Sequence, residues 1–207
     1  IMIAEIITIG TEIMVGSILN TNAKYLSSKL IERGIEPYYH TSVDDNEERL
    51  TNIINIALNR ADIIITSGGL GPTDDDMTKE VISKVLNLDL IKGSEIELQL
   101  EKRFEISNHT MTDNNRKQAM KPLGSEFIPN DNGTAPGIII KSDKNIIVML
   151  PGPPKELIPM FEHYVSPIIK GDKYILMKSI NTIGIGESAL EIELKKLNIY
   201  KGNFNIA

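Results

Sequence analysis

The segment 63–79, which reads IIITSGGLGPTDDDMTK, constrains the fold of this chain more than any other. Its first residues are apolar and mostly β-branched, which is typical of a strand buried on both faces of a sheet. The glycines that follow can adopt positive φ and bring backbone N–H groups close to a ligand. Three aspartates then lead into a helix predicted over residues 77–86. A strand, a glycine turn and a helix N-terminus in this order predict an anion-binding crevice at the carboxyl end of a sheet.

The aspartates Asp74, Asp75 and Asp76 have two interpretations. Acidic residues at the start of a helix cap free N–H groups and complement the helix dipole, so one or two of them would need no function. Three are more than capping uses, and carboxylates would repel a phosphate in the turn unless a divalent cation lay between them. We therefore favour a site for a phosphorylated ligand and a hard metal ion over a purely structural turn.

Strands and helices alternate along the first half of the chain. Apolar runs predict strands at 3–9, 37–43 and 63–66, and helical periodicity predicts helices at 22–33, from Asp45 to about 58, and at 77–86. This order is that of a parallel sheet with helices on both faces. Further helices are expected at 94–107 and within the polar segment 109–120. Beyond these, we expect strands at 124–128, 137–140 and 146–150 and a helix to about residue 164.

Three predicted strands, ending near residues 9, 66 and 150, are each followed by a glycine turn. Because the carboxyl ends of parallel strands meet at one edge of a sheet, residues after these strands are expected to line one cleft. The GTAPG turn at 133–137 and the NNRKQ segment at 114–118 should flank the aspartate turn on opposite sides. Cations and amides in NNRKQ suit phosphate or sugar hydroxyls, although an ordinary solvated helix face explains them equally well.

Composition excludes several classes of function. A formal net charge of −6, without a basic stripe, argues against nucleic acid as the main partner. The absence of cysteine excludes disulfides, thiolate nucleophiles and cysteine-ligated zinc, and it fits a reducing cytosol. No apolar run approaches the ~20 residues of a membrane span, and no leader is evident. We therefore expect a soluble cytoplasmic protein that does not bind membranes.

The chain is expected to contain one full domain, residues 1–170, and the beginning of a second, residues 171–207. The second part has a strand-like run at 174–183, a glycine turn, and a helix with Ser188 and Glu191 as a capping box. One strand and one helix cannot bury a core alone, so we interpret this second domain as incomplete.

Six motifs resemble, in order, those of the CinA family of competence/damage-inducible proteins. They are GTEIMVGSILNTNAKYL (10–26), TSGGLGPTDDDMTK (66–79), MTDNNRKQA (111–119), NGTAPG (132–137), LPGPPKEL (150–157) and GIGES (184–188). The resemblance covers the chain to about Leu197. It implies an α/β fold, the three-layer α/β/α sandwich with a mostly parallel sheet found in molybdopterin-binding domains, followed by a small KH-like domain. It also implies metal-dependent hydrolysis of the pyrophosphate of ADP-ribose, or a related nucleotide diphosphate, to AMP and a sugar phosphate. The family's nicotinamide mononucleotide deamidase domain is not expected in this chain.

The resemblance assigns site residues by motif. It makes Asp76, Asp75 and Lys117 catalytic, and it makes Asp75, Asp76 and Glu12 ligands of a divalent ion, Mg²⁺, Mn²⁺ or Co²⁺. The general base stays open between Asp75 and Glu12. Substrate-binding residues are expected to be Thr11, Glu12, Asn20, Gly68, Gly69, Gly71, Asn115, Arg116, Gln118, Gly133, Thr134, Pro151 and Gly152. A homodimer is expected. The alternative is a domain that binds molybdopterin, or serves cofactor biosynthesis, without hydrolysing its ligand.

Overall fold

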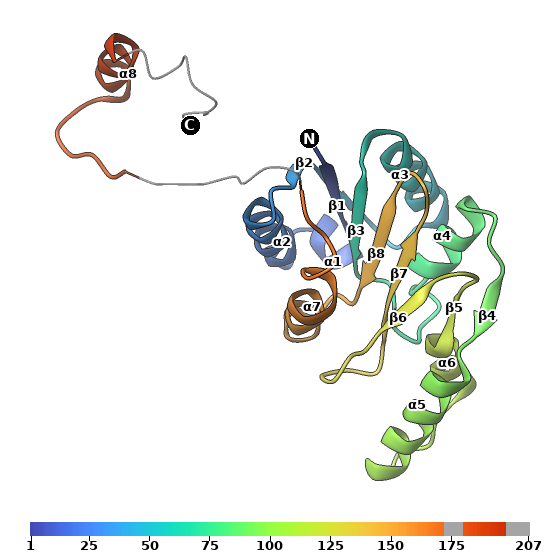
Figure 1. The fold of residues 1–207 in the computed structure, drawn as a ribbon. Coiled ribbons are helices and arrows are strands. Elements are labelled where there is room, and N and C mark those ends of the chain that lie inside the picture. The colour runs from blue at the N-terminus through green and yellow to red at the C-terminus, as the bar shows by residue number, and fades with distance from the viewer. Residues whose placement is uncertain (172–179, 198–207) are drawn as a thin grey trace. The chain divides into compact units, whose positions relative to one another are not determined.

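The structure is a computed structural model that describes residues 1–171 and 180–197 (Figure 1). The chain divides into two units, Ile1–Leu176 and Met177–Ala207. The described part of the second unit contains one helix, α8 (Glu187–Lys196). The strand expected at 174–183 lies largely outside the described residues, and its described end, 180–183, is not in a strand.

The first unit is built on a six-stranded sheet whose strand order is β2-β1-β3-β8-β7-β6. The strands are β1 (Ile3–Ile9), β2 (Glu36–Val43), β3 (Ile63–Ser67), β6 (Glu126–Ile128), β7 (Gly137–Lys141) and β8 (Ile146–Leu150). Strands β2, β1, β3 and β8 run parallel, whereas β7 is antiparallel to β8 and β6 to β7. The mostly parallel sheet is thus confirmed. The reversal at β7 arises because only a four-residue turn, 142–145, joins it to β8.

Helices cover both faces of the sheet, as Figure 1 shows. On one face lie α2 (Thr21–Glu32) and α7 (Pro154–Met160), and on the other α3 (Glu47–Arg60) and α4 (Thr78–Val85). Side chains of β1 alternate between the two layers: Ala4 and Ile6 pack against α2 and α7, and Ile7 and Ile9 against α3 and α4. The two apolar cores define a three-layer α/β/α sandwich, as expected.

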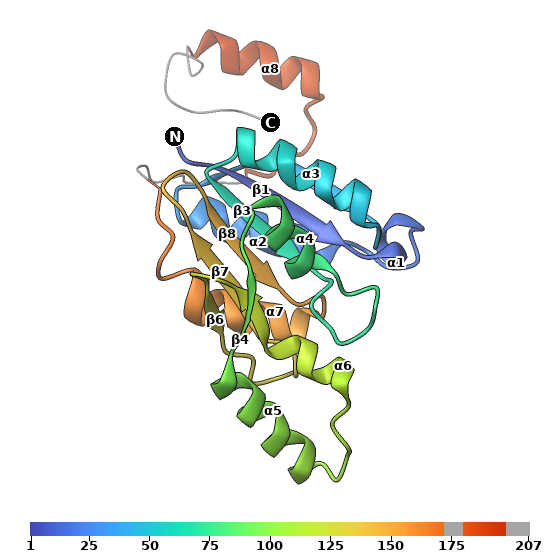
Figure 2. The same ribbon diagram turned by 90° about the vertical axis from the view of Figure 1, so that its right-hand side faces the viewer.

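A smaller substructure extends from this body, as Figure 2 shows at its lower end. It consists of the antiparallel pair β4 (Leu90–Lys92) and β5 (Met120–Pro122), the helices α5 (Ser94–Ile106) and α6 (Asp113–Arg116), and the 3₁₀ turn η1 (Lys117–Ala119). The helix expected within 109–120 is therefore only the single turn α6 followed by η1.

Two details complete the first unit. One short helix, α1 (Thr11–Met14), follows β1, and α7 continues as the π-helical segment η2 (Phe161–Val165). None of the helices in the described ranges is long and apolar enough to cross a membrane.

Candidate functional site

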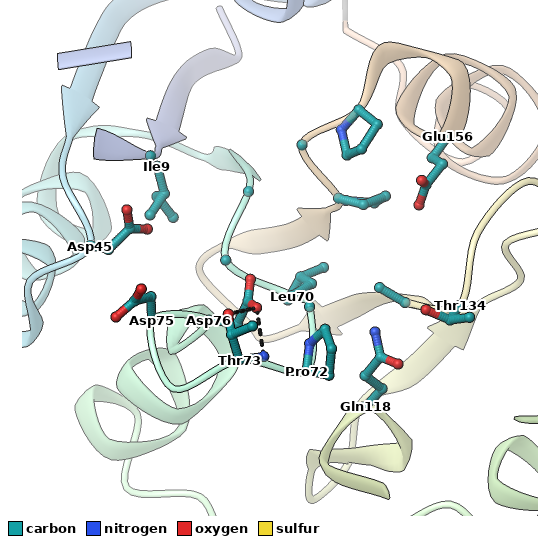
Figure 3. A pocket seen from close by; sticks show the side chains of 18 of the residues that line it. Ile9, Asp45, Leu70, Pro72, Thr73, Asp75, Asp76, Gln118, Thr134 and Glu156 are labelled. Carbon is teal, nitrogen blue, oxygen red and sulfur yellow. Dashed lines mark hydrogen bonds between the residues drawn. The ribbon is translucent and has the colours of Figure 1, made fainter. Parts of the chain in front are cut away.

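A cleft of about 400 Å³ opens at the edge of the sheet where β1, β3 and β8 end (Figure 3). Segments far apart in sequence meet there, as predicted from the shared direction of these strands. Ten of the predicted site residues line it: Glu12, Gly68, Gly69, Gly71, Asp75, Asp76, Gln118, Thr134, Pro151 and Gly152.

The floor of the cleft is the glycine turn after β3. Gly68 has φ +110°, and a Cβ there would lie 2.1 Å from the backbone oxygen of Ile9. Gly69 has φ +68°, and its Cβ would lie 2.2 Å from Oγ1 of Thr78. Both positions combine positive φ with close approach, so only glycine fits them without displacing the neighbouring backbone or side chain.

Asp76 closes its own turn instead of capping the helix. Its Oδ2 accepts hydrogen bonds from the backbone N–H of Thr73 at 2.9 Å and from the Thr73 hydroxyl at 2.5 Å. Helix α4 begins at Thr78, its N-cap is Met77, and no side chain caps it. The capping interpretation of the aspartates is therefore not realised, although Asp76 has a structural role in the turn. Asp75 is exposed on the cleft wall.

The cleft is strongly acidic. Five carboxylates line it, and the residues that line it include no lysine, arginine or histidine within the described part of the chain. Figure 3 shows Asp45 and Asp75 on one side and Glu156 on the other. No three His, Cys, Asp or Glu side chains among the described residues are close enough to hold a metal ion by themselves. A divalent ion would therefore need oxygen ligands from a phosphate or water as well, an arrangement that Mg²⁺ commonly adopts.

Two of these carboxylates, Asp45 and Glu156, were not predicted as site residues. Asp45 follows β2, and its Oδ2 accepts from both the N–H and the hydroxyl of Thr11, each at 2.9 Å. Thr11 thus lies beside the cleft and holds one of its carboxylates, although it does not line the cleft itself. The N-cap of α3 is Asn46, so Asp45, where the helix was expected to begin, lies before the helix and does not cap it. The sequence carried a signal for Asp45 and Glu156, because both residues follow strands that end at this edge of the sheet.

Gln118 is the one residue of the NNRKQ segment that lines the cleft. It is 2% exposed, and its Oε1 is buried without a hydrogen-bond partner. Buried side-chain amides are usually satisfied, so this atom is free to accept a hydrogen bond from a ligand or water in the cleft. In Figure 3, Gln118 and Thr134 both lie on the side of Asp76 away from Asp45. The expectation that NNRKQ and GTAPG flank the turn on opposite sides is wrong.

The other predicted residues of this segment are engaged elsewhere. Arg116 pairs with Glu97 at 2.6 Å and Glu101 at 2.9 Å, which ties α6 to α5. Asn115 forms the capping box of α6 and does not line the cleft. The ammonium of Lys117 donates to the backbone oxygens of Thr73, at 3.1 Å, and Asp76. It braces the aspartate turn without lining the cleft.

Smaller pockets adjoin the cleft on two sides. A pocket of about 260 Å³ shares Glu12 and Gly152 with it and is also lined by Asn20. Another, of about 230 Å³, shares Thr134 and contains Gly133. The predicted residues Asn20 and Gly133 thus lie next to the cleft. A ligand larger than the cleft could extend into either of these pockets.

The chain is similar in sequence to known proteins over its whole length. The sequence profile described as "Probable molybdopterin binding domain" matches residues 5–171. A competence-damage inducible protein of Thermoanaerobacter pseudethanolicus is 51% identical over 100% of this chain and 50% of its own length. A CinA-like protein of Dictyoglomus turgidum is 46% identical over 100% and 51%. The chain spans about half the length of the curated relatives it matches.

Solved structures extend the comparison. The protein CinA from Thermoplasma acidophilum, described as of unknown function, has a TM-score of 0.73 and 32% identity, covering 81% of this chain and 98% of that one. The tungsten cofactor synthesizing protein MoaB from Pyrococcus furiosus has a TM-score of 0.52 at 18% identity, covering 81% and 92%. The second likeness shows the fold alone.

Proposed function

This chain belongs to the CinA family, whose shared domain is described as a probable molybdopterin-binding domain, and we propose that its cleft hydrolyses a nucleotide diphosphate with a divalent metal ion. The observation that carries the proposal is the combination of a glycine-lined floor with five carboxylates. Backbone N–H groups of a glycine turn favour a phosphate, whereas the carboxylates repel it. A divalent cation bound by the carboxylates would offset this repulsion and allow the phosphate to bind.

Each group of cleft residues has a separate role in the proposed hydrolysis. Asp75, with Asp76 or Glu12 and with oxygens of the phosphate or of water, would hold the ion, which would supply neutralising charge on the phosphates and a more acidic water. Backbone N–H groups at 69–71 orient the phosphate oxygens, and the Gln118 amide hydrogen-bonds the ligand. Asp75 or Glu12 accepts the proton from the attacking water. With ADP-ribose as substrate, the P–O bond between the phosphates breaks, giving AMP and ribose 5-phosphate.

The test is AMP release from ADP-ribose in the presence of Mg²⁺, Mn²⁺ or Co²⁺, with a chelator as blank. Asp75→Asn should lower the rate by orders of magnitude because it removes a charge that faces the ion. Asp74→Asn is the matched control, since Asp74 is an exposed neighbour that does not line the cleft. Absence of AMP with all three ions, or equal rates for the two variants, would refute the proposal.

The family description favours a second candidate, binding of molybdopterin without hydrolysis. Molybdopterin also carries a phosphate, so the same glycine turn and ion would serve it. This candidate predicts saturable binding of molybdopterin, weakened by Asp75→Asn, together with no AMP release from ADP-ribose. Hydrolysis without molybdopterin binding would eliminate it.

A further inference from the structure

A buried lysine lies behind the cleft. Lys79, on α4, is 2% exposed and is the only lysine or arginine among the described residues that is buried. Within the described part it forms no ion pair, and its ammonium donates to the backbone oxygen of Lys117 at 2.6 Å. Burial lowers the pKa of Lys79 to about 8. A cation buried without a carboxylate partner is costly, so its retention calls for an explanation.

The backbone oxygen that accepts the hydrogen bond from Lys79 belongs to the peptide group joining Lys117 to Gln118. Gln118 is the buried amide with an unpartnered Oε1 that lines the cleft. The side chain of Lys117 donates to the backbone oxygens of Thr73 and Asp76. The two lysines therefore connect three segments in sequence: Lys79 joins α4 to the 3₁₀ turn η1, and Lys117 joins η1 to the aspartate turn.

We propose that Lys79 is a positioning residue that holds the Lys117–Gln118 peptide against α4, and so fixes the Gln118 amide relative to Asp76 across the cleft. The effect on ligand binding rests on the proposed function, whereas the effect on Gln118 does not. A purely structural lysine would stabilise the fold without any special connection to Gln118.

A double-mutant cycle separates these roles. Lys79→Met keeps an apolar stem but loses the donor, and Gln118→Ala removes the amide that it positions. We expect either variant alone to weaken the binding of a methylene-bridged analogue of ADP-ribose, which cannot be hydrolysed, about tenfold, the worth of one hydrogen bond. Calorimetry in the presence of Mg²⁺ measures this affinity. In the Gln118→Ala background, Lys79→Met should change affinity less than about twofold. Lys84→Met is the control, because Lys84 lies exposed on the same helix and pairs with Glu47.

A spectroscopic readout keeps the test independent of the substrate. The side-chain amide resonances of Gln118, assigned by their loss in Gln118→Ala, should shift and broaden in Lys79→Met and stay unchanged in Lys84→Met. If the wild-type chain does not bind the analogue, the proposed function fails while these resonances still decide the positioning role. Unchanged Gln118 resonances in Lys79→Met, or an equal affinity loss in both backgrounds, would overturn the inference. If Lys79→Met does not fold, Lys79→Gln, whose shorter side chain cannot span the same distance, takes its place under the same criteria.

Discussion

Replacing Gly68 by alanine tests the steric account of the cleft floor. Gly68 lies between the ends of two strands: its N–H donates to the backbone oxygen of Leu150 at 3.0 Å, and a Cβ would lie 2.1 Å from that of Ile9. The obstructing atom belongs to the backbone and cannot rotate away. Alanine at this position must therefore move β1 away from the glycine turn.

The expected cost has two parts. A residue with a Cβ at positive φ costs about 1–2 kcal/mol, and forcing extra volume into packed structure costs about 1–3 kcal/mol more. Because one kcal/mol lowers the midpoint of a domain of this size by roughly 2–4 °C, Gly68→Ala should lower Tm by roughly 4–20 °C. Differential scanning calorimetry measures this directly.

Gly16→Ala is the matched control. Gly16 has φ +73°, but no atom lies within 4 Å of its would-be Cβ. Gly16→Ala should lose only the conformational part of the free energy of unfolding, which corresponds to a fall in Tm of roughly 2–8 °C. Equal losses for the two variants would refute the claim that contact with Ile9 makes Gly68 indispensable.

Three further predictions concern charge. Asp76→Asn should keep the fold, because the amide oxygen can still accept from Thr73, yet lower ADP-ribose hydrolysis by orders of magnitude, with partial recovery at higher metal concentration. Arg60→Met should cost about 3–5 kcal/mol in urea denaturation, because it leaves the fully buried carboxylate of Glu5 without its cation; a loss under 1 kcal/mol would contradict this. The folded-state pKa of Lys79, about 8, lies below the ordinary value of 10.5, so the unfolded chain binds more protons between these limits. The free energy of unfolding of the wild type should therefore rise by roughly 3 kcal/mol relative to that of Lys79→Met as pH rises from 7 to 10.5. A difference between the two free energies that does not change with pH would contradict this prediction.

The sequence predicts the sheet best where strands are buried on both faces. The bounds of strands β1, β3 and β8 were predicted almost to the residue because each strand is mostly apolar and β-branched. The pair β4 and β5 escaped prediction, since three residues in each strand carry no measurable periodicity. The antiparallel edge was equally hidden, because strand direction follows from the connecting turn and from packing.

The site was predictable where its chemistry lies in one segment, as at the glycine and aspartate turn. Asp45 and Glu156 follow strands that end at the cleft, but the sequence does not show which of the side chains after a strand line the cleft beside Asp75. Arg116 was predicted to bind the substrate, but the sequence does not show which carboxylates its guanidinium pairs with in the fold. Two glutamates on α5 bind it, so it lies outside the cleft.

Binding of Mn²⁺ tests the central claim most directly, because the described carboxylates hold no ion site of three ligands by themselves. Electron paramagnetic resonance counts free Mn²⁺ during titration of the chain with and without a methylene-bridged analogue of ADP-ribose, which cannot be hydrolysed. The account predicts that the analogue tightens Mn²⁺ binding at least tenfold, and that Asp75→Asn abolishes this gain while Asp74→Asn retains it. Mn²⁺ binding that is indifferent to both the analogue and Asp75 would contradict a metal-assisted diphosphate site in this cleft.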